Sequence, residues 1–251
     1  MKPVFALITL VSACLTATPG ALAVPSNLPA DIWAVGTAWT QDQQRVQYYE
    51  YHYADNPELD LPTRVEYRDP GGRIFASKKI DYSDSLIAPS VSQQDYRNQA
   101  QLQTEHSAEP AAQVIRVNFR PHDSDQLQQT EIATRDTLIV DAGFDPFVRK
   151  HWDNLVGGRR VTADFLVPAR MDSVRISVSR TDTANCPADS QPLHCFVIRP
   201  AGLLRVVGWL VDPIYIGYHQ ETRRLLVFNG LSNLRDDAGE PRNALIKFEY
   251  F

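Results

Sequence analysis

Short runs rich in β-branched and aromatic residues recur along this chain about every ten residues, with turn-forming residues between them. This spacing favours an antiparallel meander, because parallel strands need long crossover connections that are usually helical. The pattern therefore predicts a mainly β protein. The runs that we interpret as strands or strand pairs are 45–55, 63–82, 113–121, 136–143, 159–168, 172–181, 194–200, 203–220, 213–233 and 231–251.

The segment 63–82 is the clearest predicted hairpin. Two runs with alternating apolar residues flank the tetrapeptide Asp-Pro-Gly-Gly at 69–72. Proline presets one turn angle and glycine accepts a positive φ, so this tetrapeptide favours a turn. In 113–121, Ile115, Val117 and Phe119 alternate with polar residues, which predicts a strand with one buried face.

One segment, 141–158, departs from the strand pattern and predicts a helix over 145–156. Asp145 is placed to cap this helix, and a proline at position 146 loses no intrahelical hydrogen bond. Phe144 would pack as a staple before the cap, and glycines 157 and 158 would end the helix. Apolar and aromatic residues recur at three- and four-residue steps and so share one face. They are Phe147, Val148, His151, Trp152 and Leu155.

A helix this short is stable only when its apolar face is buried. The inner side of a bent antiparallel sheet offers such a place. We therefore predict one β-rich domain over residues 24–251, folded as a curved antiparallel meander, or half-barrel. One amphipathic helix would pack on its concave face.

The first 23 residues have the layout of a secretory signal peptide. Lys2 precedes an apolar run over 4–15, a Pro-Gly pair breaks any helix, and Ala-Leu-Ala at 21–23 predicts cleavage after Ala23. The apolar run is shorter than the ~20 residues that cross a bilayer. In the alternative reading, Val-Ser-Ala-Cys at 11–14 is a loose lipobox and Cys14 carries a lipid anchor. Both readings predict an exported protein, and cleavage after Ala23 predicts a free periplasmic one.

The charge and hydropathy of the remaining chain argue against two classes of partner. Without Lys2 the chain has 24 basic and 30 acidic residues, a formal charge of −6. A nucleic-acid-binding protein usually presents a basic face, so we expect no nucleic-acid partner. We also expect no transmembrane span in the mature chain, because no second apolar run is long enough.

Cys186 and Cys195 are the cysteines left after cleavage, and they flank a polar loop that contains proline. Two such cysteines in an oxidising compartment are expected to form a disulfide. A loop of this length would gain about 2–3 kcal/mol from the bridge. A metal site built from both thiolates and His194 is the alternative, but it lacks a fourth ligand at a useful spacing.

Three stretches carry a resemblance to known proteins: EYRDPGGRIFASKKIDY, DAGFDPFVRKHWDNLVGG and YHQETRRLLVFNGLSNLRDDAGE. They resemble exported, uncharacterised proteins of Gram-negative bacteria. The meander with an inserted helix is similar to the half-barrel of LolA-like lipoprotein carriers. This resemblance implies a sheet that holds an acyl chain beneath covering helices. The present chain departs from that pattern by having one strong helix, and no functional residue can be carried over position by position.

We find no motif that predicts catalysis. A serine hydrolase would need Gly-x-Ser-x-Gly, whereas Ser232 has one glycine before it and Asn233 after it. We interpret Gly230, Ser232 and Asn233 as a bend between two strands. We therefore predict no catalytic residue, no cofactor and no enzymatic activity.

Two acidic clusters are weak candidates for metal ligands. The first follows a strand and comprises His122, Asp123 and Asp125. The second lacks the spacing of a calcium loop and is interpreted as a hairpin turn; it comprises Asp236, Asp237 and Glu240. We predict no metal site from either cluster, because the geometry and a fourth ligand are unsupported.

The candidate ligand-binding residues lie on the helix and in the tyrosine-rich strand. His151 is interpreted first as a hydrogen-bonded core or rim histidine and second as a polar group at the mouth of a cavity. Tyrosines 48, 49, 51 and 53 give the strand aromatic residues on both faces. Contact with a ligand or ordinary packing of the sheet would explain them equally well. The residues predicted to line a cavity are Phe147, His151, Trp152, Leu155, Tyr49 and Tyr51.

These features predict a periplasmic binding or carrier module for a lipid or other apolar ligand, without enzymatic activity. The alternative is a structural or assembly protein of the envelope that acts through protein–protein contacts. An enzyme would require His122, His151, Asp123 and Asp141 to gather around one open cleft.

Overall fold

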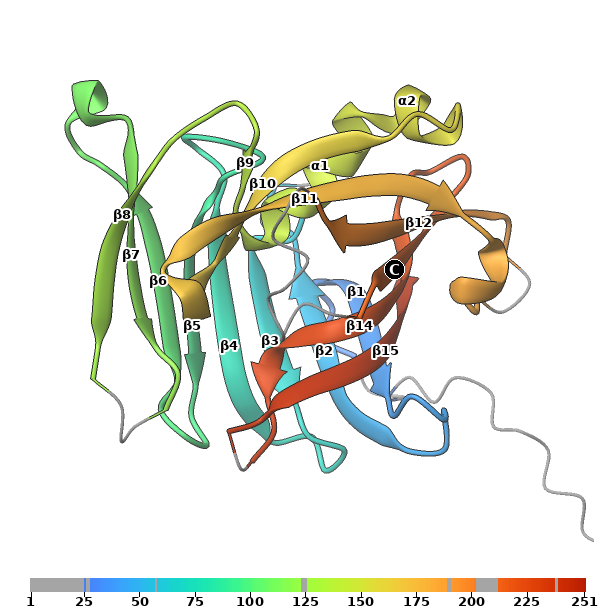
Figure 1. The fold of residues 1–251 in the computed structure, drawn as a ribbon. Coiled ribbons are helices and arrows are strands. Elements are labelled where there is room, and N and C mark those ends of the chain that lie inside the picture. Colours follow the sequence, from blue (N-terminus) through green and yellow to red (C-terminus); the bar gives the residue numbers. More distant parts are fainter. Residues whose placement is uncertain are drawn as a thin grey trace, which may run out of the picture.

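A computed structural model describes residues 25, 28–56, 58–122, 126–188, 191–201, 212–237 and 239–251. Within these residues the protein is mainly β, with fifteen strands in one open sheet (Figure 1). The predicted signal peptide, Cys14, Asp123, Asp125 and residues 203–211 of the predicted strand region 203–220 lie outside the described residues. Export and processing therefore remain predictions.

The N-terminal part of the sheet is a run of eight strands joined by short connections. They are β1 (Ile32–Trp39), β2 (Val46–Tyr53), β3 (Arg64–Arg68), β4 (Ile74–Asp81), β5 (Ser90–Asp95), β6 (Gln101–His106), β7 (Val114–Arg120) and β8 (Gln128–Ala133). The 3-10 helix η1 (Pro110–Ala112) lies between β6 and β7.

The C-terminal part contains the helices and the remaining strands. The helical elements are η2 (Asp141–Gly143), α1 (Phe144–Lys150), α2 (Trp152–Val156), η3 (Pro168–Arg170) and η4 (Thr183–Asn185). The strands are β9 (Leu138–Ile139), β10 (Val161–Val167), β11 (Asp172–Thr181), β12 (Leu193–Pro200), β13 (Ile214–His219), β14 (Leu225–Arg235) and β15 (Pro241–Tyr250).

The order of the strands follows the chain almost without interruption. It runs β8-β7-β6-β5-β4-β3-β2-β1-β15-β14-β13-β12-β11-β10-β9, so the first and last strands pair at the middle of the sheet. Ala34 lies opposite Tyr250 and Trp39 opposite Leu245 in this central antiparallel pair. β9 and β10 are parallel, and every other pair is antiparallel. The predicted antiparallel meander is thus confirmed in its topology.

The predicted hairpin at 63–82 forms from β3 and β4. The amide of Gly72 donates to the carbonyl of Asp69 at 2.8 Å, and the amide of Asp69 donates to the carbonyl of Arg73 at 3.0 Å. Gly72 has φ +86°, which a residue with a Cβ atom adopts only with strain. The Asp-Pro-Gly-Gly tetrapeptide is therefore the turn that its residue types predict.

The largest apolar cluster joins strands that are distant in the chain. Ile115 and Val117 of β7 belong to the same buried cluster as Leu166 of β10 and Ile246 and Phe248 of β15. Burying a side chain of this size stabilises a fold by roughly 1.5–3 kcal/mol. Contacts between the two parts of the sheet therefore contribute to the stability of the fold.

The predicted helix is present, but it is divided into two short helices at His151. This residue has φ −103° and ψ +14°, which lies outside the regular helical region. The amide of Leu155 donates to the carbonyl of His151 at 3.0 Å, so His151 begins the hydrogen bonding of α2. Gly158 follows α2 with φ +82°, as expected for a glycine that ends a helix.

The predicted cap at Asp145 is wrong. α1 begins at Phe144 after Gly143, and no side chain caps it. The Asp145 carboxylate instead lies 2.9 Å from the guanidinium of Arg149, one turn further along the same helix. Phe144 is consequently a helical residue and not a staple, and its ring centroid lies 6.1 Å from that of Phe147.

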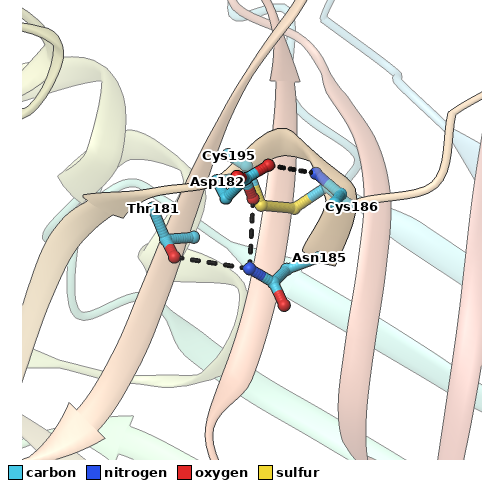
Figure 2. The surroundings of a disulfide bond; sticks show 6 residues. Thr181, Asp182, Asn185, Cys186 and Cys195 are labelled. Atoms are coloured by element: carbon cyan, nitrogen blue, oxygen red, sulfur yellow. Dashed lines mark hydrogen bonds between the residues drawn. A yellow bond between two sulfur atoms is a disulfide. The ribbon is translucent and has the colours of Figure 1, made fainter.

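The predicted disulfide between Cys186 and Cys195 is present (Figure 2). Cys186 follows η4, and Cys195 lies in β12. The carboxylate of Asp182 accepts a hydrogen bond from the amide of Ala184 at 2.8 Å and caps η4. The disulfide ties the η4 loop to the sheet. Both cysteines are buried there in an apolar cluster with Leu193, Leu226, Val227 and Leu245. No helix in the described part of the chain is long and apolar enough to cross a membrane.

Candidate functional site

A groove of about 850 Å³ opens beside α1, and we call it the α1 groove. Its walls include residues of the β2–β3, β4–β5 and β8–β9 connections and residues next to the β6–β7 connection. These connections lie at the same end of the strands, because successive connections of an antiparallel meander alternate between its two ends. The volume is in the range of small-molecule sites.

The lining of the α1 groove combines apolar and polar side chains. The apolar residues are Leu59, Leu61, Leu86, Ile87, Ala88 and Pro146. The polar and charged residues are Asp84, Ser85, His106, Gln113, Thr134, Arg135, Asp136, Arg149 and Lys150. Polar and charged residues therefore outnumber the apolar ones in this lining by nine to six, and both kinds of surface are available to a ligand with an apolar and a polar part.

Opposite sides of the helical segment make different contacts. Phe147, Val148, Trp152 and Leu155 are buried in a cluster with residues of β10–β13, among them Ala163, Ile176, Phe196 and Ile216. Pro146, Arg149 and Lys150 of the same segment line the α1 groove. The segment therefore packs on the sheet with one side and forms a wall of the groove with another.

Ion pairs hold the groove wall to two other parts of the chain. Arg149 donates to the carboxylate of Asp60 at 3.0 Å, and Arg224 donates to the other oxygen of the same carboxylate at 2.7 Å. Asp60 lies in the β2–β3 connection with φ +47°, a conformation that aspartate tolerates better than most residues. One carboxylate thus connects α1 with the β13–β14 turn.

The two carboxylates beside Arg149 have pKa values shifted in opposite directions. Burial raises the pKa of Asp145, and the charge of Arg149 offsets only part of this effect. Burial also opposes ionisation of Asp60, but hydrogen bonds from Arg224 and Arg149 outweigh it and hold the pKa below its ordinary value. Asp60 is therefore the firmly ionised partner of the two arginines.

Close packing fixes the start of the helical segment against the groove wall. A Cβ atom at Gly143 would lie 2.1 Å from the carbonyl oxygen of Ile87, so a larger residue there requires a shift of the backbone. The amide of Val140 donates to the same carbonyl at 3.0 Å. Because Ile87 lines the α1 groove, the position of α1 and the shape of the groove are linked.

None of the six predicted ligand-binding residues lines the α1 groove. Phe147, Trp152 and Leu155 are buried, with exposed fractions of 2%, 6% and 0%. His151 is half-buried with its ring centroid 4.6 Å from that of Phe147. Burial and the nearby charge of Lys150 lower the pKa of His151.

The tyrosines of β2 lie in two different apolar clusters. Tyr48 belongs to the largest cluster, and the other three belong to or border a smaller one. Tyr51 is buried with Val35 and Tyr53, and Tyr49 packs against this cluster. The guanidinium carbon of Arg68 lies 4.2 Å from the centroid of the Tyr51 ring. The structure therefore does not bring Tyr49 and Tyr51 together with the predicted residues of the helix, and their binding role stays a prediction.

Ser232 and Asn233 do not form the predicted bend between strands. Both lie within β14, which has a register irregularity between Leu231 and Arg235. The Ser232 hydroxyl lies 3.0 Å from the hydroxyl of Tyr48 and also accepts from the amide of Leu234 at 3.1 Å. Neither contact is the histidine pairing that a serine nucleophile uses.

The second acidic cluster forms the β14–β15 turn, as predicted. The amide of Asp236 donates to the carbonyl of Glu240 at 3.0 Å, and Asp237 pairs with Arg97 at 2.6 Å. In the described part of the chain, no group of three His, Cys, Asp or Glu residues is arranged to hold a metal ion.

The residues that would have favoured an enzyme have separate surroundings. Asp141 forms an ion pair with the buried Lys78, whereas the ring of His151 lies on Phe147. His122 lies near Gly239 in the β14–β15 turn.

Sequence reasoning missed Asp60 and Arg224. Asp60 stands between two leucines in a connection, an unusual place for a charge and the one signal that was available. Nothing in the sequence indicates that Arg224 reaches Asp60. Comparison of the chain with protein-family models, with curated proteins and with solved structures found no match.

Proposed function

We propose that this protein is an exported, periplasmic binding or carrier module for a lipid or other apolar ligand, without enzymatic activity. The ligand lies in the α1 groove. The observation that carries this proposal is the groove itself, about 850 Å³ in volume with six apolar residues in its lining. Contact with Leu59, Leu61, Leu86 and Ile87 removes the apolar part of the ligand from water.

This proposal places the ligand on a different side of the helical segment from the sequence prediction. The side with Phe147 and Trp152 is already covered by residues of β10–β13, so a ligand there would have to displace core side chains. Close-packed cores resist such insertion. The side with Pro146 and Lys150 borders an open groove and requires no displacement.

The proposal includes a curved sheet, or half-barrel, with the helical segment on its concave side. Residues of β7, β10 and β15 share one buried cluster, which is expected if the sheet bends around its own apolar face. Phe147 and Trp152 share a second buried cluster with residues of β12 and β13. Sheet curvature then also brings the connections that line the groove toward α1.

A fluorescence titration with a pyrene-labelled fatty alcohol tests ligand binding. Leu86 lines the groove and is 48% exposed, so Leu86→Asp places a charge in the groove with little effect on the core. We expect the affinity to fall roughly tenfold or more, since an apolar contact worth about 1.5–3 kcal/mol is lost. Leu127 is 45% exposed and lies outside the groove, so Leu127→Asp is the matched control and keeps the wild-type affinity.

Two results would reject this function. Equal affinities of the wild type and Leu86→Asp would move the ligand away from the groove. The second result would come from native mass spectrometry and crosslinking of protein taken from envelope extracts. A stable protein partner with no co-purifying lipid would favour the alternative, an assembly protein of the envelope.

A further inference from the structure

Three polar side chains next to the α1 groove have buried atoms without a hydrogen-bond partner in the protein. The atoms are the hydroxyl oxygen of Tyr82, Oδ1 of Asp145 and Nε of Arg149. Nη2 of Arg149 also lacks a well-aligned hydrogen bond, but it lies 2.9 Å from Oδ2 of Asp145 in an ion pair. The large majority of buried side-chain polar atoms in proteins are hydrogen-bonded, because a buried polar atom without a partner destabilises the fold. Three such atoms in one region indicate a group that satisfies them from outside the chain.

Tyr82 and Arg149 connect this region with the groove. Tyr82 follows β4 directly, is 9% exposed and belongs to the same buried cluster as Leu61 and Ala88. Both of these residues line the groove, and so does Arg149. Burial raises the pKa of Tyr82, and the charges of Asp145 and Arg149 shift it further in opposite directions, so the three side chains are electrostatically coupled.

The unpaired atoms define the chemistry of a binding partner. The Tyr82 hydroxyl and Nε of Arg149 can donate, whereas Oδ1 of an ionised Asp145 can only accept. A group that satisfies all three must have an acceptor oxygen and a donor hydrogen. A hydroxyl group has both, whereas a fully ionised phosphate has no hydrogen to donate.

The charges around Arg149 also disfavour an anion. Arg149 and Arg224 contribute two positive charges, and Asp60 and Asp145 contribute two negative charges when they are ionised. The arginines are therefore already neutralised. An anionic group would meet two carboxylates without an uncompensated cation among these four residues.

We propose that Tyr82, Asp145 and Arg149 bind the head group of the ligand and select a neutral head group with a hydroxyl. The acyl or alkyl part of the same ligand lies in the α1 groove. This inference rests on the proposed function and names its ligand class: a neutral hydroxylated amphiphile.

Three probes with the same pyrene-labelled chain test the inference: the fatty alcohol, the corresponding phosphate monoester and the hydrocarbon without a head group. We expect the wild type to bind the alcohol more tightly than the other two. Tyr82→Phe removes one donor and should weaken alcohol binding about threefold to tenfold, the equivalent of one hydrogen bond. Its affinity for the hydrocarbon should not change.

Tyr96→Phe is the matched control. Tyr96 is 50% exposed and lies outside the groove, so its substitution should leave the affinity for all three probes unchanged. Thermal unfolding of Tyr82→Phe checks its fold. Its midpoint should stay near that of the wild type, because the lost hydroxyl has no partner in the protein.

The outcomes separate this inference from the proposed function. If no probe binds to the wild type, both fall. If the alcohol and the hydrocarbon bind equally well, or Tyr82→Phe weakens both alike, the groove stands and the head-group site is wrong. Tighter binding of the phosphate monoester than of the alcohol overturns the neutral ligand class. Should Tyr82→Phe fail to fold, the ranking of the three probes on the wild type decides.

Discussion

The two sides of the helical segment after β9 have different surroundings. Phe147, Trp152 and Leu155 are buried against β10–β13, whereas Arg149 and Lys150 border the α1 groove. The regular apolar spacing that identifies the helix in the sequence belongs to the first side. The amphipathic pattern therefore marks the face that packs in the core, whereas the residues that border the groove show no regular apolar spacing.

The largest expected effect comes from emptying the packed side. Trp152→Ala should lower the free energy of unfolding by about 3–5 kcal/mol, because a large buried side chain is removed and a cavity remains. Urea denaturation measures this loss. Affinity of the folded fraction for the fatty alcohol should change by less than about twofold, since Trp152 is not among the groove residues.

Leu86→Ala gives the opposite result and serves as the control for this comparison. Leu86 is exposed, so we expect a change in stability within about 0.5 kcal/mol together with weaker binding of the fatty alcohol. The separation of the two sides would be contradicted if Trp152→Ala weakened binding as much as Leu86→Ala.

Gly143 directly precedes α1 and packs against the backbone of Ile87, which lines the groove. Its substitution should therefore affect both the packing of α1 and the shape of the groove. Gly143→Ala should destabilise the fold by about 1–3 kcal/mol, because the new Cβ atom would lie 2.1 Å from the carbonyl oxygen of Ile87. The strain must move either α1 or the β4–β5 connection, so binding should weaken as well. Denaturation and probe titration of the same variant measure the two effects.

Gly71→Ala controls for the general effect of removing a glycine. The nearest atom to its new Cβ would be a carboxylate oxygen of Asp69 at 3.2 Å, which belongs to a side chain that can move. A Gly143→Ala variant that bound the fatty alcohol as the wild type does would show that groove shape is independent of the helix start.

Local sequence patterns predicted part of this fold, but no predicted run covers β1, β5, β6 or β8. Turn chemistry at 69–72, the spacing of strand-like runs and the apolar spacing of 147–155 are all local, and each corresponds to an observed element. The disulfide could also be predicted, since the two cysteines are near each other in the chain. The break at His151 was missed because its residue type does not reveal its backbone angles.

The candidate site could not be predicted in the same way. The groove is built from connections and from α1, which are distant in the chain, and the contact of Asp60 with Arg149 and Arg224 joins residues up to 164 positions apart. Such contacts depend on the path of the whole sheet. The error at Asp145 has a related cause: a partly buried arginine one turn away pairs with the carboxylate that a helix start would otherwise use.

The smallest expected effect concerns the pH dependence of the ion pairs that hold the groove wall. Hydrogen bonds from Arg224 and Arg149 lower the pKa of Asp60 below its ordinary value. A carboxylate with a lowered folded-state pKa stabilises the fold above the unfolded-state pKa of about 3.9, and this contribution is lost as the pH falls through the folded-state pKa. Asp60→Asn should therefore lower the free energy of unfolding by about 1–2 kcal/mol at pH 7, and the difference from the wild type should shrink below about pH 4.

Glu131 provides the control, because its ion pair with Arg116 is more than half exposed. The free energy of unfolding of Glu131→Gln should stay within about 0.5 kcal/mol of the wild type at every pH. Urea denaturation between pH 2.5 and pH 7, a range of about 1.4 units below and 3 units above the ordinary aspartate pKa, measures both variants. If the difference for Asp60→Asn stayed constant over this range, Asp60 would stabilise the fold through packing. Its ion pairs with Arg149 and Arg224 would then not hold α1 in place.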